Sequence, residues 1–184
     1  MSICAQIQRC VRLGELHQLF PRLDSDPVER RVFISTEIKG ALDGPWPHEE
    51  AERRCGELQG DLEAFVKGDN IGMCLTAYQH RAAYMGRLDM PKDEVWDIRS
   101  RRNPPALRIF GRFASVDTFV AFRIRPRSVR VDLLNSEPLG GAKSREWQFA
   151  IIETLQEWNR LLPNLNPPHG DDLNVYVSNK RFLI

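Results

Sequence analysis

Cysteine is scarce in this sequence and poorly spaced for metal binding. Zinc fingers and zinc ribbons need closely spaced ligand pairs, and adding His48 or His80 would not supply one. We therefore predict no metal site, and we expect the cysteines to be small buried side chains in a reducing compartment. The chain has four cysteines without a CxxC pair among them: Cys4, Cys10, Cys55 and Cys74.

Long apolar runs are also missing. No stretch approaches the roughly 18 consecutive apolar residues of a membrane helix. The first residues, MSICAQIQRCVRLGELHQLF, lack the basic start, apolar centre and small-residue cleavage site of a secretory signal. The composition, 42% hydrophobic and 28% charged, is typical of a folded globular chain rather than a disordered one. We predict a cytoplasmic protein with no membrane partner.

Several catalytic signatures are absent as well. The sequence has no P-loop, GxGxxG or HExxH motif, and no recognisable Ser-His-Asp set. Nucleotide-binding, metalloprotease and serine-hydrolase functions therefore find no support, and we predict no cofactor.

Helical spacing of apolar residues recurs in three segments. Ser144 is a good N-cap for the last of them, and Pro163 ends it. Gly68 suits the residue just beyond the end of the second. Gly14 interrupts the first, which we nevertheless extend to Pro21. We predict helices over residues 2–20, 49–67 and 145–162.

Strand-like segments are concentrated after residue 90. The spacing predicts a three-stranded meander over residues 95–99, 107–113 and 118–124, with short connections that favour antiparallel pairing. Earlier strands are expected at 31–38 and 71–78, and the tail from residue 173 is either a strand or a short helix followed by a strand. We predict a single α+β domain over residues 1–184. It is built on an antiparallel β-meander packed against amphipathic helices, with a mostly helical half over 1–90 and the meander plus long helix over 91–184.

Charge is distributed unevenly along the chain. The net charge is only +1, yet nine arginines lie between Ile98 and Arg130, where Asp117 is the one acidic residue. One interpretation is an anionic partner for one face, and the other is neutralisation by acidic residues elsewhere in the chain. The arginines are Arg99, Arg101, Arg102, Arg108, Arg112, Arg123, Arg125, Arg127 and Arg130.

Alternation along the three strands assigns these side chains to two faces. We expect the apolar face, with Trp96, Ile98, Leu107, Ile109, Phe113, Val120, Phe122 and Ile124, to pack on helix 145–162. Arginine forks suit phosphate, and phenylalanine rings can stack on bases, so the other face suits RNA or single-stranded DNA. Its candidate nucleic-acid-binding residues are Arg99, Arg108, Phe110, Arg112, Phe119, Arg123 and Arg125.

The alternative is that this second face is closed. Phe110 and Phe119 would then form a second small core, and the arginine stems would lie over it. Asp97 and the acidic residues of the remaining chain would pair with the guanidinium groups.

The strand and arginine pattern resembles the RelE/ParE toxin superfamily, in particular its phage-derived HigB-like branch. The matching residues are VWDIR (95–99), LRIFGRF (107–113), TFVAFRIRPRS (118–128) and the helix from Glu146, within residues 93–162. The resemblance implies a toxin with an antitoxin partner that cuts mRNA on the ribosome or poisons gyrase. It also implies that Arg99, Arg108, Arg112 and Arg123 hold RNA, often with a tyrosine or histidine assisting proton transfer.

Candidates for that proton transfer are few. His169 lies in the expected loop NPPHGD, and Tyr176 lies in the tail. RNA cleavage needs the 2′-hydroxyl activated and the leaving oxygen protonated, and arginine is a poor proton donor. Two hypotheses follow: a RelE-like protein acting on nucleic acid, or a non-catalytic interaction protein whose basic face docks an acidic protein or is neutralised internally.

Overall fold

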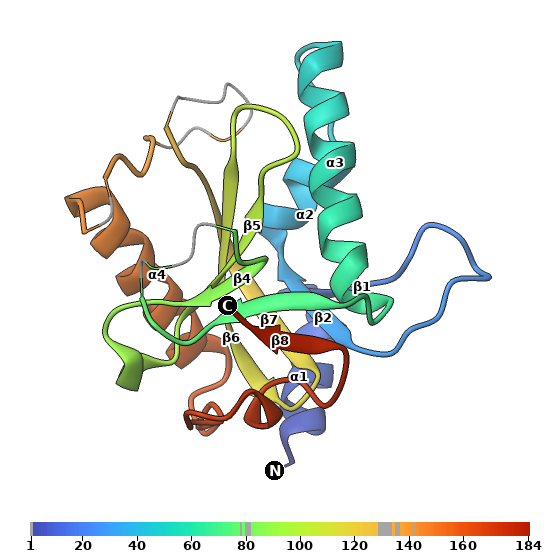
Figure 1. Cartoon of the computed structure of the whole chain (residues 1–184). Helices are drawn as coiled ribbons and strands as arrows, with labels where there is room; N and C mark the ends of the chain where they lie inside the picture. The colour runs from blue at the N-terminus through green and yellow to red at the C-terminus, as the bar shows by residue number, and fades with distance from the viewer. Residues whose placement is uncertain (1, 78, 80–81, 129–133, 135–136, 142) are drawn as a thin grey trace.

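An eight-stranded mixed sheet forms the centre of the molecule (Figure 1). The computed structural model describes residues 2–77, 79, 82–128, 134, 137–141 and 143–184, to which these counts refer. The strands are β1 (Leu16–Leu19), β2 (Arg31–Ser35), β3 (Ile71–Cys74), β4 (Met85–Arg87), β5 (Trp96–Ser100), β6 (Leu107–Ser115), β7 (Thr118–Pro126) and β8 (Arg181–Leu183). Their order is β1-β2-β7-β6-β5-β4-β3-β8.

Four α-helices cover the two faces of the sheet. They are α1 (Ile3–Arg12), α2 (Thr36–Asp43), α3 (Glu49–Val66) and α4 (Arg145–Leu161), with short 3-10 helices at η1 (Pro91–Asp93) and η3 (Leu173–Val175). Figure 1 shows α2 and α3 on one side of the sheet and α4 on the other. Among the described residues, no helix is both long enough and apolar enough to cross a membrane.

The hydrophobic core divides between the two faces. On the α3 side, Trp96, Ile98 and Phe113 pack with Leu62 and Phe65 of α3. On the α4 side, one cluster joins α1, the sheet and the end of α4 around Trp158, and a second lies under the start of α4 around Trp147. Each face of the central strands is therefore buried.

Two of the three predicted helices are confirmed with their caps. The side chain of Ser144 accepts a hydrogen bond from the Trp147 backbone N–H at the start of α4. Gly68 follows the end of α3 at φ +76°, a conformation that glycine adopts without penalty. The tail follows the second of its two predicted alternatives, η3 and then β8.

The predicted helix over residues 2–20 is wrong in its second half. The helix ends at Arg12, and Gly14 takes φ +71°, which reverses the chain. Residues Leu16–Leu19 then pair antiparallel with β2 as the edge strand β1. The apolar residues Leu16 and Leu19, which continue the helical spacing beyond Gly14, belong to this strand.

The expected mostly helical N-terminal half is also wrong, because the first 90 residues contribute β1 to β4 as well as three helices. β5, β6 and β7 are antiparallel neighbours, but they belong to a mixed sheet rather than to a separate meander. The pairs β2–β7, β3–β4 and β3–β8 are parallel. Strands from either side of residue 90 are thus neighbours in the sheet.

Two β-bulges between β6 and β7 change which residues share a face. Phe110 pairs with Arg123 and Gly111 with Ala121, so Phe122 is an extra residue, and Ala114 is the extra residue of the second bulge. Val120 and Phe122 consequently face α4, while Ile124 faces α3. The predicted apolar face is therefore wrong in part, and its main cover is α3 rather than α4.

Gly111 makes the first bulge possible, because a Cβ there would lie 2.2 Å from the Val120 carbonyl oxygen. We predict that Gly111→Ala lowers the free energy of unfolding by about 1–3 kcal/mol through overpacking. Gly40→Ala is the control, since nothing lies within 4 Å of a Cβ at this α2 position. The control should be neutral or stabilising by about 0.5–1 kcal/mol. Urea unfolding measures both, and equal effects would contradict the explanation.

Candidate acid–base site around Glu94

The residues predicted to bind nucleic acid do not form one open surface. Phe110 and Phe119 are fully buried and lie on opposite faces of the sheet. Phe110 packs against Trp147 of α4, and Phe119 packs against Phe113 in the core under α3. Neither ring presents a face on which a base could stack in this conformation. The arginines lie on the α4 side and separate into three groups.

Arg123 and Arg125 form the first group, which is neutralised by helices on both faces of the sheet. Arg125 lies 2.8 Å from Glu37 of α2 and 2.6 Å from Glu153 of α4. Arg123 lies within 4 Å of the same two carboxylates and of Glu157. Two guanidinium groups thus face three carboxylates, as the internally neutralised alternative requires.

Arg99 and Arg108 form the second group, which shares Asp97. The Arg99 Nε–H donates to both carboxylate oxygens of Asp97, at 3.1 and 3.2 Å. Arg108 Nη1 lies 3.2 Å from Asp97 Oδ2. All three residues are largely or wholly buried.

Arg112 forms the third group and has a different environment. Its guanidinium carbon lies 4.7 Å from the ring centroid of Trp158 in α4, and the residue is only 7% exposed. Burial lowers the pKa of Arg112 to about 10, although the nearby carboxylates of Asp93 and Glu94 partly offset this. Among the described residues, its Nε has no hydrogen-bond partner. Arg112 is therefore a buried cation with one N–H that no described acceptor satisfies.

Glu94, which lies between η1 and β5, is the centre of a polar network. It follows η1 in the left-handed region, at φ 49° and ψ 37°, and is 1% exposed. Its Oε2 accepts from the Trp96 indole and lies 2.9 Å from the Tyr176 hydroxyl. Its Oε1 accepts from Arg87 at 3.3 Å and lies 2.6 Å from Nδ1 of His169. Four side chains thus contact the two oxygens of this buried carboxylate.

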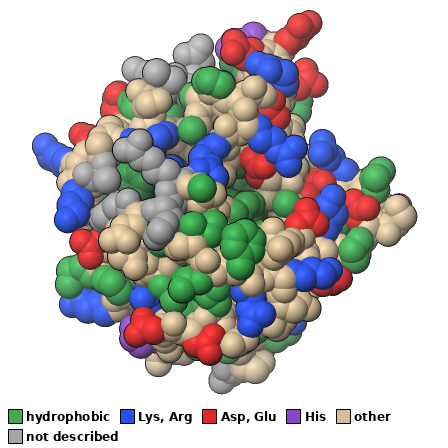
Figure 2. Space-filling model, in the orientation of Figure 1, with side chains coloured by type: hydrophobic (Ala, Val, Ile, Leu, Met, Phe, Trp, Pro, Cys, Tyr) green, Lys and Arg blue, Asp and Glu red, His purple; other side chains and the backbone are tan. Residues whose placement is uncertain are grey.

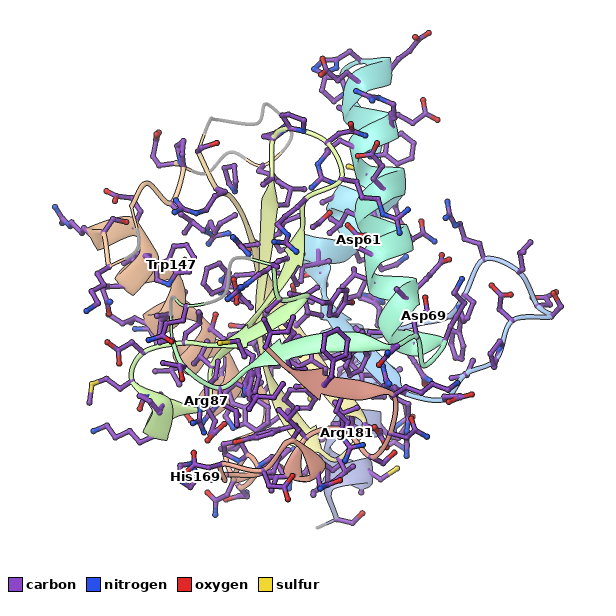
Figure 3. All side chains as sticks on the ribbon, in the orientation of Figure 1. Asp61, Asp69, Arg87, Trp147, His169 and Arg181 are labelled. Atoms are coloured by element: carbon purple, nitrogen blue, oxygen red, sulfur yellow. The ribbon has the colours of Figure 1, made fainter. Side chains whose placement is uncertain are left out.

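His169 joins this network to the surface. Its Nδ1 faces a carboxylate oxygen of Glu94, so in the neutral ring Nδ1 carries the proton and Nε2 is the nitrogen that can accept one. The side chain is 64% exposed, whereas Glu94 is buried. Figure 3 shows His169 at the edge of the molecule, with Arg87 nearby.

Tyr176 and Arg87 hold the network together from the inside. The Tyr176 hydroxyl lies between Glu94 Oε2 and the Gly170 carbonyl oxygen and accepts from the Gly170 backbone N–H. Burial, and then the hydrogen bond to Glu94, raise the pKa of Tyr176 to about 12. Tyr176 is fully buried, so it positions Glu94 and the loop rather than reaching a ligand.

Arg87 fixes the loop that carries His169. It donates to the Leu75 and Gly170 carbonyl oxygens and pairs with Asp171 at 2.9 Å. Burial alone would lower the pKa of Arg87, but Asp171 and Glu94 hold it above its ordinary value. The same hydrogen bond lowers the pKa of exposed Asp171. The guanidinium group of Arg87 therefore holds this loop against β4 through Gly170 and Asp171.

The structure thus brings together two residues that the sequence singled out, His169 and Tyr176, around two that sequence reasoning missed, Glu94 and Arg87. Arg112, the third candidate, lies over Trp158 of α4. Arg87 lies on β4, within a stretch that showed no clear pattern. Glu94 precedes a strand in a left-handed turn that its residue type does not predict. The available signal was a charged pair, seven residues apart, flanking the turn before β5.

The cysteine expectation fits three of the four residues. Cys10, Cys55 and Cys74 are buried, Cys4 is exposed, and all four are free thiols. In the part of the chain that the structure describes, no group of three or more His, Cys, Asp or Glu side chains could hold a metal ion.

Comparisons with protein-family models, with curated proteins and with solved structures found no match to this chain.

Tyr176→Phe tests the network through its pH dependence. We predict a loss of about 1–3 kcal/mol in the free energy of unfolding near neutral pH, because removing the hydroxyl takes away one of the hydrogen-bond donors to Glu94. The pKa of Tyr176 is raised to about 12 in the folded state, above the ordinary value of about 10. Its contribution is therefore complete below pH about 10 and is lost as pH rises through about 12.

The measurement is chemical unfolding of wild type and variant at several pH values. The stability difference between them should shrink as pH rises from about 9 to about 11.5. Thr154→Val is the control, because it removes a buried hydroxyl that donates to the Ala150 carbonyl oxygen and that does not titrate in this range. A Tyr176→Phe difference that stays constant over this range would contradict the assignment.

Proposed function

We propose that this chain is an acid–base catalyst acting on RNA, with His169 as its general base. The observation that carries the proposal is the 2.6 Å contact between His169 Nδ1 and buried Glu94, with the ring otherwise exposed. A carboxylate that fixes one imidazole nitrogen leaves the other ready to accept a proton in a defined direction. Glu94, Tyr176 and Arg87 are positioning residues in this scheme.

The proposed reaction is cleavage of the RNA chain by the ribose 2′-hydroxyl, which lies next to the phosphate that it attacks. Nε2 of neutral His169 takes the proton of the ribose 2′-hydroxyl, and the 2′-oxygen attacks the adjacent phosphorus. The bond from phosphorus to the 5′-oxygen breaks, and water supplies the proton that this oxygen needs. The products are a 2′,3′-cyclic phosphate and a 5′-hydroxyl. General base catalysis of this kind typically contributes about 10²–10⁴-fold.

Arg112 supports the choice of an anionic substrate. Its guanidinium carbon lies 4.7 Å from the ring centroid of Trp158, and no described residue accepts a hydrogen bond from its Nε–H. A guanidinium group fits phosphate oxygens well and stabilises charge that develops in the reaction. Asp171, the exposed carboxylate beside His169, is paired with Arg87, which reduces its repulsion of a phosphate.

The resemblance to the RelE/ParE superfamily supports RNA as the substrate class. It extends the proposal to mRNA on the ribosome, to an antitoxin-like protein as partner and to a cytoplasmic place of action. The roles that it suggests for Arg99, Arg108 and Arg123 are not part of the proposal, because these side chains are largely buried and pair with carboxylates of the chain itself.

A second candidate is a non-catalytic interaction protein. The observation that favours it is the closed charge balance around Arg123 and Arg125, which are matched by Glu37, Glu153 and Glu157. In this case the Glu94 network would only anchor the loop before η3, and His169 would be its solvated end.

The experiment is cleavage of an end-labelled single-stranded RNA by the purified full chain. We predict that His169→Ala lowers the cleavage rate about 100-fold or more, because it removes the proton acceptor. His17→Ala is the matched control, since His17 lies on edge strand β1 and is outside the network. The wild-type product should carry a 2′,3′-cyclic phosphate.

Two results would overturn the proposal. One is wild-type protein that leaves RNA intact, with or without ribosomes, which favours the interaction protein. The other is cleavage that survives in His169→Ala at the level of the His17→Ala control.

Arg112→Met separates substrate binding from proton transfer. We predict that it raises KM for RNA about 10-fold or more, because the variant keeps the contact with Trp158 but loses the cation. Circular dichroism checks that the fold is retained, and Arg112→Lys should recover part of the loss. An unchanged KM and kcat in Arg112→Met would exclude this arginine from the site.

A further inference from the structure

A small cavity lies between the start of α1 and one end of the sheet, at residues that the Glu94 network does not use. Its volume is about 120 Å³. An apolar cavity of about 150 Å³ takes up a benzene ring, so this one suits a molecule of roughly that size or smaller. Helix α1 contributes Ile3, Cys4 and Ile7, and the sheet contributes Arg31, Phe33 and Thr118.

Three polar side chains form a row along the sheet side of the cavity. Thr118 of β7 pairs with Arg31 of β2 and with Ser115 of β6, and all three line the cavity. Directly paired residues of neighbouring strands point to the same face of a sheet. Phe33, two residues after Arg31 on β2, shares this face and packs in one cluster with Ile7 of α1. The guanidinium group and the two hydroxyls therefore lie on the face that α1 covers.

Arg31 supplies a positive charge beside this cavity. It is the exposed first residue of β2, so its guanidinium group is accessible to a ligand that enters from solvent. Among the described residues, none forms an ion pair, a hydrogen bond or a ring contact with its side chain. The described residues that line the cavity include no Asp or Glu. An anion in the cavity would therefore meet a guanidinium group that no described carboxylate neutralises.

The acidic residues nearest in sequence to this row have partners elsewhere. The Asp117 carboxylate accepts a hydrogen bond from the Ser178 backbone N–H at 3.0 Å and lies 3.9 Å from Nε of Arg30. Glu29 pairs with Lys180 at 3.2 Å. Neither carboxylate belongs to the lining of the cavity. The charge balance beside the cavity thus favours a negatively charged ligand.

Thr118 has an unused hydroxyl at the cavity. The residue is only 4% exposed, and no described group forms a hydrogen bond with its Oγ1. Most buried hydroxyl groups in proteins have a partner, so this one is open to donate to a ligand or to accept from one. The Ser115 hydroxyl beside it makes only a long contact, 3.4 Å, with the Val116 carbonyl oxygen.

The other walls of the cavity are mainly apolar. Ile7 and Phe33 are almost fully buried. Ile3 and Cys4 lie in the first turn of α1, which contains no acidic residue, and the N-terminus of a helix favours an anion. Figure 2 shows acidic and basic side chains interspersed over the visible face, with no broad basic field for a long polyanion there. One cation beside apolar walls instead suits a small anion that has an apolar part.

We propose that this cavity binds a free monocarboxylic acid with a short aliphatic or aromatic group, as its anion. The fork of Arg31 matches the two carboxylate oxygens, and the Thr118 hydroxyl can donate to one of them. The apolar part of the acid would lie against Ile7 and Phe33, where its burial adds to the affinity. The site goes beyond the proposed RNA cleavage, because none of its lining residues contacts Glu94 or His169.

The experiment measures binding of benzoate and pentanoate to the purified chain, at constant ionic strength with chloride as the balancing ion. We expect a saturable rise in Tm, because ligands of the native state stabilise it. Cys4 gives a local readout, since it lines the cavity and is exposed, whereas Cys10, Cys55 and Cys74 are buried. Bound benzoate should slow alkylation of Cys4 by iodoacetamide, followed by mass spectrometry.

Two further ligands separate the contribution of the charge from that of the apolar part. Benzamide has the shape of benzoate without its charge, so it should bind at least about 10-fold more weakly. Acetate keeps the carboxylate but buries fewer methylene groups, so it should bind at least about 5-fold more weakly than pentanoate.

Variants assign the binding to the row of polar side chains. Arg31→Met should weaken benzoate binding about 10-fold, and Arg31→Lys should recover part of the loss, because it keeps the charge but not the fork. Thr118→Val should weaken binding about 3-fold by removing one donor. Arg12→Met is the matched control, since Arg12 is exposed on α1 and lies outside the cavity. His169→Ala should bind benzoate as wild type does, which separates this proposal from the RNA proposal.

The proposal is overturned if neither benzoate nor pentanoate has a saturable effect beyond that of chloride, or if benzamide binds as well as benzoate. It is equally overturned if Arg31→Met, checked for its fold by circular dichroism, binds benzoate as tightly as Arg12→Met.

Discussion

The rest of this structure depends on burying positive charge on one face of its sheet. The α4 face carries Arg99, Arg108, Arg112, Arg123 and Arg125, and a buried guanidinium group needs a carboxylate, an aromatic face or both. α4 supplies these at matching positions along its length. Trp158 lies over Arg112, and Glu153 and Glu157 reach Arg123 and Arg125. The docking of α4 is therefore set by charge pairing as much as by apolar contact.

This pairing explains why the sequence predicted the elements better than their packing. The period of apolar residues and the caps at Ser144 and Gly68 are local signals, and they predicted α3 and α4 well. Which face each helix covers depends on contacts distant in sequence, such as Glu37 with Arg125. The sequence left open whether the arginine-rich face is exposed, as arginine usually is, or closed by other parts of the chain. Here its countercharges come from α2 and α4, far apart in the chain.

The bulges set a second limit on prediction. Strict alternation along β7 assigned Val120, Phe122 and Ile124 to one face, but the extra residue Phe122 divides them between two. Gly111 was the clue in the sequence, since a glycine inside a strand often marks a bulge or a close backbone approach. Residue type alone does not say which of the two strands carries the extra residue. The sequence therefore did not show that Ile124 lies on the opposite face from Val120 and Phe122.

In the candidate site too, residue type could be read from the sequence, but the contacts between distant residues could not. His169 and Tyr176 could be singled out because few other side chains transfer protons, yet their partner Glu94 lies 75 residues before His169. Burying Glu94 required a donor on every side, and Trp96, Arg87 and Tyr176 satisfy that need from the interior. His169 is the donor that reaches solvent. The proposed proton transfer therefore depends on this imidazole, because its ring joins the buried carboxylate to solvent.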